Sequence, residues 1–201
     1  RSNARKARYQ QVATASTESQ QQMLERLQLN GEVHYRLKRR AEERGLLFMS
    51  TAFDSESLAF LSNDLGLPLL KIPSGEITNG PFLLEYARTN RDLMLSTGMS
   101  TVEEIKAALS VLAFGLTGGN SPSIHAFDAA FASEEGQCAL RMQVTLLHCT
   151  SQYPASIGSA NLKALASMQA AFGLRIGYSD HTAGTIVTCA AVALGARAIE
   201  K

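Results

Sequence analysis

The 201-residue chain lacks several features that would place it in other classes of protein. Its three cysteines, Cys138, Cys149 and Cys189, include no Cys-x-x-Cys pair, so we expect reduced, buried thiols and a cytoplasmic setting. No apolar run approaches the ~18 residues of a membrane span, and nothing resembles a secretory signal. A formal net charge of +1 gives no reason to expect nucleic acid, a membrane surface or an acidic partner.

What is present indicates one substantial domain with a buried core. The composition is 45% hydrophobic and 18% charged, which is ordinary for a globular protein. The chain starts at Arg1 without an initiator methionine and stops at Lys201, directly after a strand-like run. We therefore expect it to be part of a longer protein.

Strand-like apolar runs alternate with helical patterns at steps of 25–30 residues. Helix starts are predicted after Asp54, at Gly80-Pro81 and at a capping box, Ser100-Thr-Val-Glu103. This rhythm, without a Gly-rich dinucleotide fingerprint, favours a TIM (β/α)8 barrel over a doubly wound sheet. A whole barrel needs about 250 residues, so we expect about strands 3 to 8, with the first two β/α units missing. The six strands are expected over residues 46–49, 69–72, 93–95, 144–147, 174–178 and from 198.

Two segments depart from this rhythm. Residues 1–20 are polar and without a clear period, so they are predicted to form a long loop, with a helix beginning around Ser19. Residues 116–143 form an inserted loop between a helix and the next strand. An insertion there lies on the stability face of a barrel, away from the chemistry, and we assign it no catalytic role.

Polar residues cluster where four predicted strands turn into helices, which is the edge of a β/α barrel where catalytic groups collect. We therefore expect one composite site. The four clusters are Lys71-Ile-Pro-Ser-Gly-Glu76, Ser96-Thr-Gly-Met99, His148-Cys-Thr150 and Ser179-Asp-His-Thr182.

The residue types at these turns suit an anion, although each has a plainer interpretation. Lys71 ends a strand where a charge needs an anion or a salt-bridge partner. Ser96 and Thr97, with the helix start that follows, can approach a phosphate or carboxylate, or can simply cap that helix. Glu76 follows Lys71 and Ser74 in the same turn and can serve chemistry or cap the next helix.

The histidines and a tyrosine are also open to two interpretations. His181 follows a carboxylate at a strand end, and a functional imidazole and a polar core histidine are equally consistent with its position. His148 is expected to be hydrogen-bonded in the interior. Tyr153 can contact a polyhydroxylated ligand or simply pack. His34 and His125 are expected at the surface.

In their order along the chain, these clusters resemble the sialic acid synthase family, which comprises N-acetylneuraminate synthase and its legionaminate and pseudaminate relatives. The resemblance implies a TIM-barrel enzyme that condenses phosphoenolpyruvate with an open-chain N-acetylated amino sugar aldehyde, typically N-acetylmannosamine, and releases phosphate. It also implies a divalent cofactor, Mn²⁺ or Mg²⁺. The blocks that carry it are Phe48-Met-Ser-Thr-Ala-Phe-Asp54, Lys71-Ile-Pro-Ser-Gly-Glu-Ile-Thr-Asn79, Leu95-Ser-Thr-Gly-Met99, Leu147-His-Cys-Thr-Ser-Gln-Tyr-Pro154, Gly177-Tyr-Ser-Asp-His-Thr182 and Ile199-Glu-Lys201; Lys6-Ala-Arg-Tyr-Gln10 with Glu18-Ser-Gln20 resembles the active-face loop after the family's second strand.

The resemblance also implies a role for individual residues. Glu76 matches a position that contacts the sugar or shuttles a proton, and Tyr153 matches a ligand-contacting tyrosine. His181 matches one of two metal-binding histidines. Ser151 stands where several members carry asparagine. The positions that hold the phosphate and carboxylate of phosphoenolpyruvate are matched by Lys71, Ser74, Ser96 and Ser179.

The chain departs from the family pattern in what it lacks. The second metal-binding histidine is expected directly after Lys201 in the intact protein, and a C-terminal antifreeze-like domain, which in the family reaches over a dimer partner's active site, is absent. We therefore expect the chain alone to be inactive and the intact protein to be a homodimer. Two alternatives stay open: a legionaminate- or pseudaminate-type synthase in surface-polysaccharide synthesis, and a non-catalytic homologue or fragment.

Overall fold

The structure is a computed structural model that describes residues 6, 10, 11 and 18–201. Most of the predicted loop over residues 1–20 lies outside the described residues. The chain divides into two compact units, residues 1–48 and 49–201.

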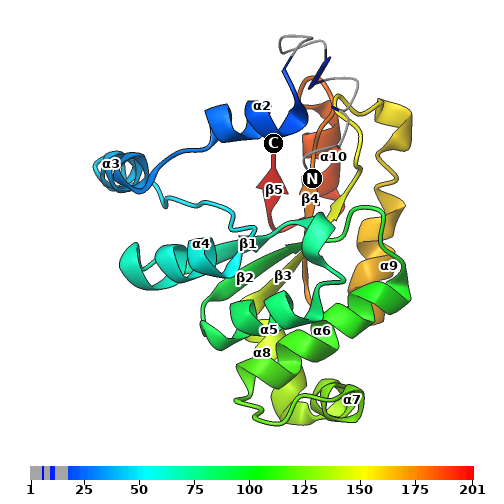
Figure 1. The fold of residues 1–201 in the computed structure, drawn as a ribbon. Coiled ribbons are helices and arrows are strands. Elements are labelled where there is room, and N and C mark those ends of the chain that lie inside the picture. The colour runs from blue at the N-terminus through cyan, green and yellow to red at the C-terminus, as the bar shows by residue number, and fades with distance from the viewer. Residues whose placement is uncertain (1–5, 7–9, 12–17) are drawn as a thin grey trace. The chain divides into compact units, whose positions relative to one another are not determined.

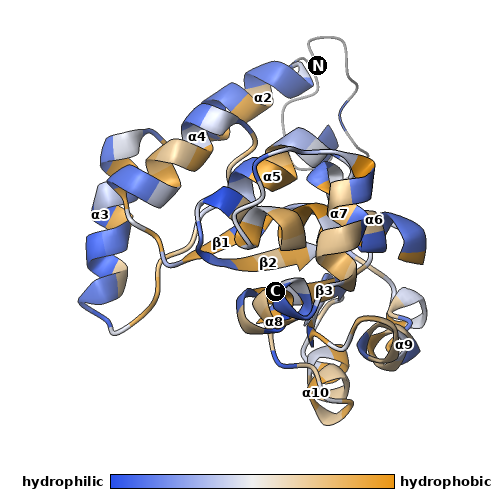
Figure 2. Ribbon diagram, turned by 90° about the horizontal axis from the view of Figure 1, so that it is seen from below, coloured by the Kyte–Doolittle hydropathy of each residue, from blue (hydrophilic) through white to orange (hydrophobic). Residues whose placement is uncertain are grey.

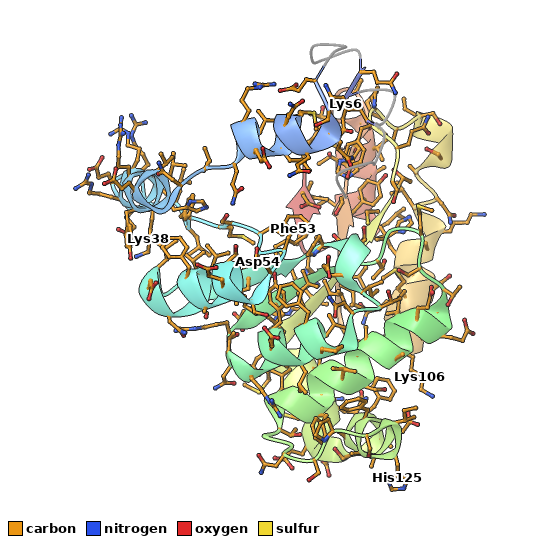
Figure 3. All side chains as sticks on the ribbon, in the orientation of Figure 1. Lys6, Lys38, Phe53, Asp54, Lys106 and His125 are labelled. Carbon is orange, nitrogen blue, oxygen red and sulfur yellow. The ribbon has the colours of Figure 1, made fainter. Side chains whose placement is uncertain are left out.

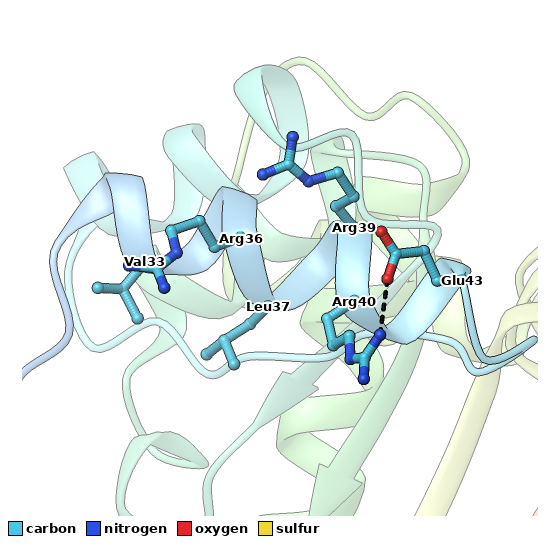
Figure 4. A pocket seen from close by; sticks show the side chains of 6 residues that line it. All are labelled: Val33, Arg36, Leu37, Arg39, Arg40 and Glu43. Atoms are coloured by element: carbon cyan, nitrogen blue, oxygen red, sulfur yellow. Dashed lines mark hydrogen bonds and ion pairs between the residues drawn. The ribbon is translucent and has the colours of Figure 1, made fainter.

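Within its described residues, the first unit contains helices α2 (Gln20–Leu27) and α3 (Gly31–Glu42). The predicted helix start at Ser19 is confirmed, because the Ser19 hydroxyl accepts a hydrogen bond from the Gln22 backbone and the Gln22 side chain accepts one from the Ser19 backbone. Helix α3 buries none of its residues. The helix lines a cavity of about 450 Å³ with Val33, Arg36, Leu37, Arg39, Arg40 and Glu43, and Arg40 pairs with Glu43 there (Figure 4).

The second unit is built on five parallel strands that pair in chain order. Figure 1 shows them with the helices that follow them along the chain. The strands are β1 (Leu69–Ile72), β2 (Asp92–Ser96), β3 (Val144–Cys149), β4 (Arg175–Ser179) and β5 (Ile199–Glu200). The helices are α4 (Ser55–Ala59), α5 (Gly80–Arg88), α6 (Val102–Leu116), α7 (Ile124–Ala132), α8 (Glu134–Gln143), α9 (Lys163–Phe172) and α10 (Ile186–Ala193); shorter turns are the π-helical η1 (Phe60–Asp64) and the 3₁₀ helices η2 (Ser74–Glu76) and η3 (Ile157–Ser159).

The sheet curves strongly. Strands β1 and β5 form its two edges, yet Lys71 Nζ of β1 lies 3.1 Å from Glu200 Oε1 of β5. In a flat sheet, four interstrand spacings of about 4.8 Å would put these edges about 19 Å apart. The pairing in chain order, with no reversal of strand order, is that of a β/α barrel. The second unit is thus a parallel α/β half-barrel.

The core lies between the strands and the surrounding helices. Leu70, Ile72, Leu93 and Leu95 are fully buried on the helix side of the sheet, and Figure 2 shows much of β1 and β2 in the colour of hydrophobic residues. Tyr86 of α5 joins the two layers, because its hydroxyl donates to the carbonyl oxygens of Ala52 and Lys71. Burying these apolar side chains provides most of the driving force for the fold.

Two helix starts are confirmed and one is shifted. Asp54 caps α4 through the Ser57 backbone (Figure 3), and Pro81 lies in the first turn of α5. The capping box of α6 is formed by Thr101 and Glu104, one residue later than predicted. The sequence Ser100-Thr-Val-Glu-Glu104 contains two overlapping Ser/Thr-x-x-Glu patterns, and the helix uses the second.

The prediction of six strands is wrong by one. Residues 46–49 form no strand, and this stretch contributes only an isolated bridge between Thr51 and Lys71. The side chains of Leu46 and Leu47 are more than half exposed. An apolar run becomes a strand only where a neighbour satisfies its backbone hydrogen bonds, and among the described residues none does so here.

The 116–143 segment does lie between a helix and a strand, as predicted, but it is mostly helical rather than a loop. Ser123 and Ser133 cap α7 and α8, and Phe127 of α7 packs edge-on against Phe114 of α6. The segment reaches the amino end of β3, at the opposite end of the strands from the predicted site. Figure 3 shows His125 projecting outward from α7, at the predicted surface position.

The cysteines are free thiols, as predicted, but they are not all buried. Cys138 on α8 and Cys189 on α10 are exposed, whereas Cys149 at the end of β3 is partly buried. Among the described residues, no helix is both long enough and apolar enough to cross a membrane.

Candidate active site at the carboxyl ends of the strands

Strand alternation sorts the polar residues at the strand ends onto two faces. Successive side chains of a strand point to opposite faces, and residues paired in register share a face. The register pairs Ser96 with Leu147, Cys149 with Ser179, and Ser179 with Glu200. Ser96, Cys149, Ser179 and Glu200 therefore all lie on the inner face of the sheet. Lys71, the penultimate residue of β1, pairs with Met94, which has the same parity as Ser96, so Lys71 lies on this same inner face. The side chains of His148, Tyr178 and Asp180 therefore belong to the other face, toward the helices.

The inner face carries a charged and hydrogen-bonded group of three residues. The Glu200 carboxylate pairs with Lys71 at 3.1 Å and accepts a hydrogen bond of 2.5 Å from the Ser179 hydroxyl. The Lys71 side chain is only 12% exposed. Burial by itself would raise the pKa of Glu200, but the Ser179 hydrogen bond and the Lys71 ammonium together hold that pKa below its usual value.

Three further side chains converge on the turn after β2. A Cβ atom at Gly98 would lie 2.8 Å from Ser151 Oγ, 3.0 Å from Cys149 Sγ and 3.2 Å from Ser74 Oγ. The Ser96 side chain also lies near Cys149 and lowers the pKa of its thiol, against the larger effect of burial. The turns after β1, β2 and β3 thus bring Ser74, Ser96 and Ser151 into one neighbourhood.

His181 lies beside Tyr153 at the mouth of this region. Their ring centroids are 4.2 Å apart, and the Ala155 backbone N–H donates to the His181 carbonyl, which joins the two loops. Burial lowers the pKa of His181, against the opposing pull of the Glu200 and Asp180 carboxylates. The charges of Lys71 and Glu200 act on both His181 and Cys149, so these groups share one electrostatic environment.

The Asp180 side chain does not join the inner-face group of Lys71, Ser179 and Glu200, although its charge acts on His181. Its side chain is fully buried and accepts hydrogen bonds from Thr182, Thr188 and Lys201, the last at 3.0 Å. Burial would raise the pKa of Asp180, but these hydrogen bonds outweigh it and hold the pKa far below its usual value. Asp180 therefore fixes the turn that carries His181 and ties it to the end of β5.

Glu76 and His148 occupy positions of their own. The Glu76 carboxylate is buried and accepts a hydrogen bond of 2.8 Å from Asn79, and Asn79 is the residue that caps α5. The capping role considered for Glu76 is therefore indirect. His148 hydrogen-bonds with the Ala160 carbonyl at 3.0 Å, which confirms the predicted hydrogen bond, and the residue is half-buried.

The sequence analysis assigned no role to Glu200 or to Cys149, although Cys149 lies in one of the four predicted clusters. Both end strands, and both have the same side-chain parity as Ser179 in the register. That parity is the signal that would have found them. The salt-bridge interpretation of Lys71 is also realised, with Glu200 as the partner.

His181 is assigned as a metal ligand by the resemblance alone. In the part of the chain that the structure describes, no three His, Cys, Asp or Glu residues are placed to hold a metal ion together. A catalytic metal usually takes several protein ligands. The described residues therefore do not make a complete metal site, and the assignment of His181 as a ligand stays a prediction.

Comparison with known proteins supports the resemblance drawn from the sequence. The chain is 46% identical over 198 residues to N,N'-diacetyllegionaminic acid synthase of Campylobacter jejuni, covering 98% of this chain and 52% of that protein. It is 41% identical to the protein of the same name from Legionella pneumophila, with 98% and 49% covered. It is 28% identical to human N-acetylneuraminate-9-phosphate synthase, with 87% and 42% covered. The chain thus spans about half the length of these relatives.

Solved structures agree. The N-acetylneuraminic acid synthetase of Leptospira borgpetersenii superposes with a TM-score of 0.70 at 30% identity, over 87% of this chain and 52% of that one. A truncated 3-deoxy-D-arabino-heptulosonate 7-phosphate synthase of Thermotoga maritima has a TM-score of 0.58 at 17% identity, over 86% of this chain and 60% of that one, which shows a shared fold. The NeuB family model matches residues 1–201. The chain belongs to the NeuB family, the family of the sialic acid synthases.

Proposed function

We propose that the intact protein condenses phosphoenolpyruvate with an N-acetylated amino sugar aldehyde to give a sialic-acid-type nonulosonate and phosphate. One observation carries the proposal: an ammonium group and several hydroxyls from consecutive strand ends lie on the inner face of the half-barrel. A cation with several hydroxyl donors suits a small polyanion in a partly dry pocket. The residues are Lys71, Ser74, Ser96, Ser151 and Ser179.

The reaction balances as follows. C3 of phosphoenolpyruvate forms a bond to the aldehyde carbon, and the aldehyde oxygen takes up a proton to become a hydroxyl. Water adds to the resulting cation at C2 and loses a proton. The bond between C2 and the phosphate oxygen then breaks, and the C2 hydroxyl gives its proton to the departing phosphate, which leaves a ketone and inorganic phosphate.

The residues of this chain have separate tasks in the proposal. Lys71 and the serines hold the phosphate and carboxylate. Glu76 accepts a sugar hydroxyl or shuttles a proton, and Tyr153 contacts the sugar. The Lys71–Glu200 pair implies that an incoming anion competes with, or joins, the Glu200 carboxylate at Lys71.

A divalent ion, Mn²⁺ or Mg²⁺, belongs to the proposal only through the resemblance. His181 would supply one ligand, and the ion would polarise the aldehyde oxygen when bound. Because the described residues supply no group of three ligands, no step is assigned to the metal here. A homodimeric intact protein is likewise proposed from the family resemblance.

A second candidate is a legionaminate-type synthase acting on a sugar with two N-acetyl groups. The observation that favours it is the identity of 46% and 41% to the two diacetyllegionaminic acid synthases, against 28% to the human neuraminate-9-phosphate synthase. The side chains described above face the part of the substrate that both reactions share. They do not separate the two sugars.

A phosphate-release assay on the intact protein tests the proposal. Phosphoenolpyruvate is supplied with N-acetylmannosamine, its 6-phosphate, a doubly N-acetylated hexose or no sugar. We expect phosphate release that requires one of the sugars and that is reduced when Lys71 is replaced. Release that is equal with and without every sugar, or absent throughout, would point to the non-catalytic alternative.

A further inference from the structure

Gly98 lies where a side chain would collide with polar groups and not with backbone. The residue is buried in the turn after β2, and its φ lies outside the left-handed region that favours glycine. The three atoms nearest to an added Cβ all belong to side chains: Ser151 Oγ, Cys149 Sγ and Ser74 Oγ. The path of the chain therefore does not require glycine at this position.

Other glycines of the sheet and helices have a different environment. A Cβ at Gly115 would meet Ala87 and Leu84, and one at Gly177 would meet Leu147 and Ala198. These contacts are ordinary close packing of a helix or strand against its neighbour. At Gly98, by contrast, the missing side chain lets polar groups from two other turns close over the backbone.

These polar groups form one short-range cluster. Ser74 follows β1, while Cys149 and Ser151 belong to the end of β3 and the loop after it. Because all three side-chain atoms lie within 3.2 Å of one point, they lie within a few ångströms of one another, a span that one phosphate or carboxylate can bridge. Burial raises the pKa of the Cys149 thiol, so it is a neutral donor, and the charge of Lys71 reaches it.

We infer that Gly98 is a positioning residue of the proposed phosphoenolpyruvate site and that Cys149 forms part of the wall of that site. The absent side chain at 98 allows Ser74, Cys149 and Ser151 to meet, and their donors face one oxygen-bearing end of the anion. This inference rests on the proposed function and adds two residues to it.

Alkylation of the cysteines in the intact, unmodified protein tests the wall assignment. Iodoacetamide labelling is followed peptide by peptide by mass spectrometry, with the exposed Cys138 and Cys189 as internal controls. Phosphoenolpyruvate should slow labelling of Cys149 by about tenfold or more and leave both controls unchanged. Separate arms with inorganic phosphate and with pyruvate identify which end of the anion lies beside the thiol.

The positioning role is tested with Gly98→Ala in the intact protein, against Gly158→Ala as the matched control. Gly158 is exposed, and an added Cβ there meets nothing within 4 Å. We expect Gly98→Ala to raise KM for phosphoenolpyruvate by about tenfold, equivalent to roughly 1.4 kcal/mol, with little change in KM for the sugar. Gly158→Ala should leave both constants unchanged.

The outcomes separate the two levels of the proposal. Sugar-dependent phosphate release by the unmodified protein, combined with unchanged Cys149 labelling and an unchanged KM in Gly98→Ala, would overturn the inference and leave the proposed function standing. Absent phosphate release would overturn the proposed function first. If Gly98→Ala does not fold, as judged by its melting curve, the labelling of the unmodified protein decides alone.

Discussion

The ammonium group of Lys71 lies 3.1 Å from the carboxylate of Glu200, although the two residues stand on strands at opposite edges of the sheet. This contact is possible only because the sheet is rolled into half a barrel. The roll directs Lys71, Ser179 and Glu200 toward a common interior. The same curvature that closes the core thus assembles the candidate site.

Replacing Lys71 tests the anion site. Lys71→Ala in the intact protein should lower kcat/KM for phosphoenolpyruvate by an amount equivalent to about 2–4 kcal/mol of transition-state stabilisation. The reason is that a partly buried charged contact loses one partner and Glu200 is left unpaired. Steady-state kinetics with each substrate varied in turn measure this. Lys163→Ala, an exposed lysine at the start of α9, is the control. A change confined to KM for the sugar would contradict the assignment.

Replacing His181 tests the metal prediction. His181→Ala should abolish activation by Mn²⁺, because the imidazole is the proposed ligand, whereas His125→Ala on the outer helix α7 should have no effect. Phosphate release is measured over a titration of metal into chelator-treated protein. Turnover of His181→Ala that still rises with metal as in the unmodified protein would reject the ligand role.

Asp180 is expected to matter through the turn it holds. In Asp180→Asn, the amide nitrogen must face hydrogen-bond donors, and Lys201 loses its charged partner. The free energy of unfolding should therefore fall by about 1–3 kcal/mol. Denaturant melts measure the change. The surface pair of Arg40 and Glu43 supplies the control, since Glu43→Gln should change stability by at most about 1 kcal/mol.

A second expectation for Asp180→Asn concerns activity. Because the turn also carries His181, kcat should fall under conditions where the variant is fully folded, with a smaller change in KM for phosphoenolpyruvate. Equal stability of Asp180→Asn and the unmodified protein would show that the hydrogen bonds of Asp180 do not hold the turn.

Tyr86 gives a prediction for alkaline pH. Burial raises the pKa of Tyr86 above its usual range, so its contribution to stability is complete below about pH 10, the pKa of an unfolded tyrosine, and is lost as the pH rises toward the folded value. Tyr86→Phe should therefore lower stability at neutral pH by about 1–3 kcal/mol, because the carbonyls of Ala52 and Lys71 lose a donor.

The same variant should also lose less stability between neutral and alkaline pH than the unmodified protein does. Chemical unfolding at a series of pH values compares the two, with Tyr35→Phe, a half-exposed tyrosine, as the control. If the free energy of unfolding of Tyr86→Phe and of the unmodified protein falls equally as the pH rises, ionisation of Tyr86 is not the cause of the alkaline loss of stability.

Local sequence signals predicted the strands and helix starts well because those signals act within a few residues. The strand Leu69–Ile72 and the Asp54 cap depend on apolar runs and single side chains, and both are present in the structure. The run at 46–49 failed because pairing needs a neighbouring strand, which an apolar pattern does not supply. The start of α6 was predicted one residue early because the sequence contains two overlapping capping-box patterns there.

The site could be predicted as a set of strand-end turns, but not as contacts. Ser179 and Asp180 are adjacent, and the sequence suggested that they act together with His181. Their strand parity sends Ser179 inward to Glu200 and Asp180 outward to Thr188. The pairing of Lys71 with Glu200 depends on how far the sheet rolls, which no local pattern encodes.

The most direct measurement follows the fate of phosphoenolpyruvate labelled with carbon-13 at C3, incubated with the intact protein and the sugar that supports phosphate release. The account predicts that the labelled methylene signal moves to the C3 methylene of a nine-carbon sugar acid, in an amount equal to the phosphate released. A label that appears only as the methyl group of pyruvate, or that stays in phosphoenolpyruvate, would contradict it.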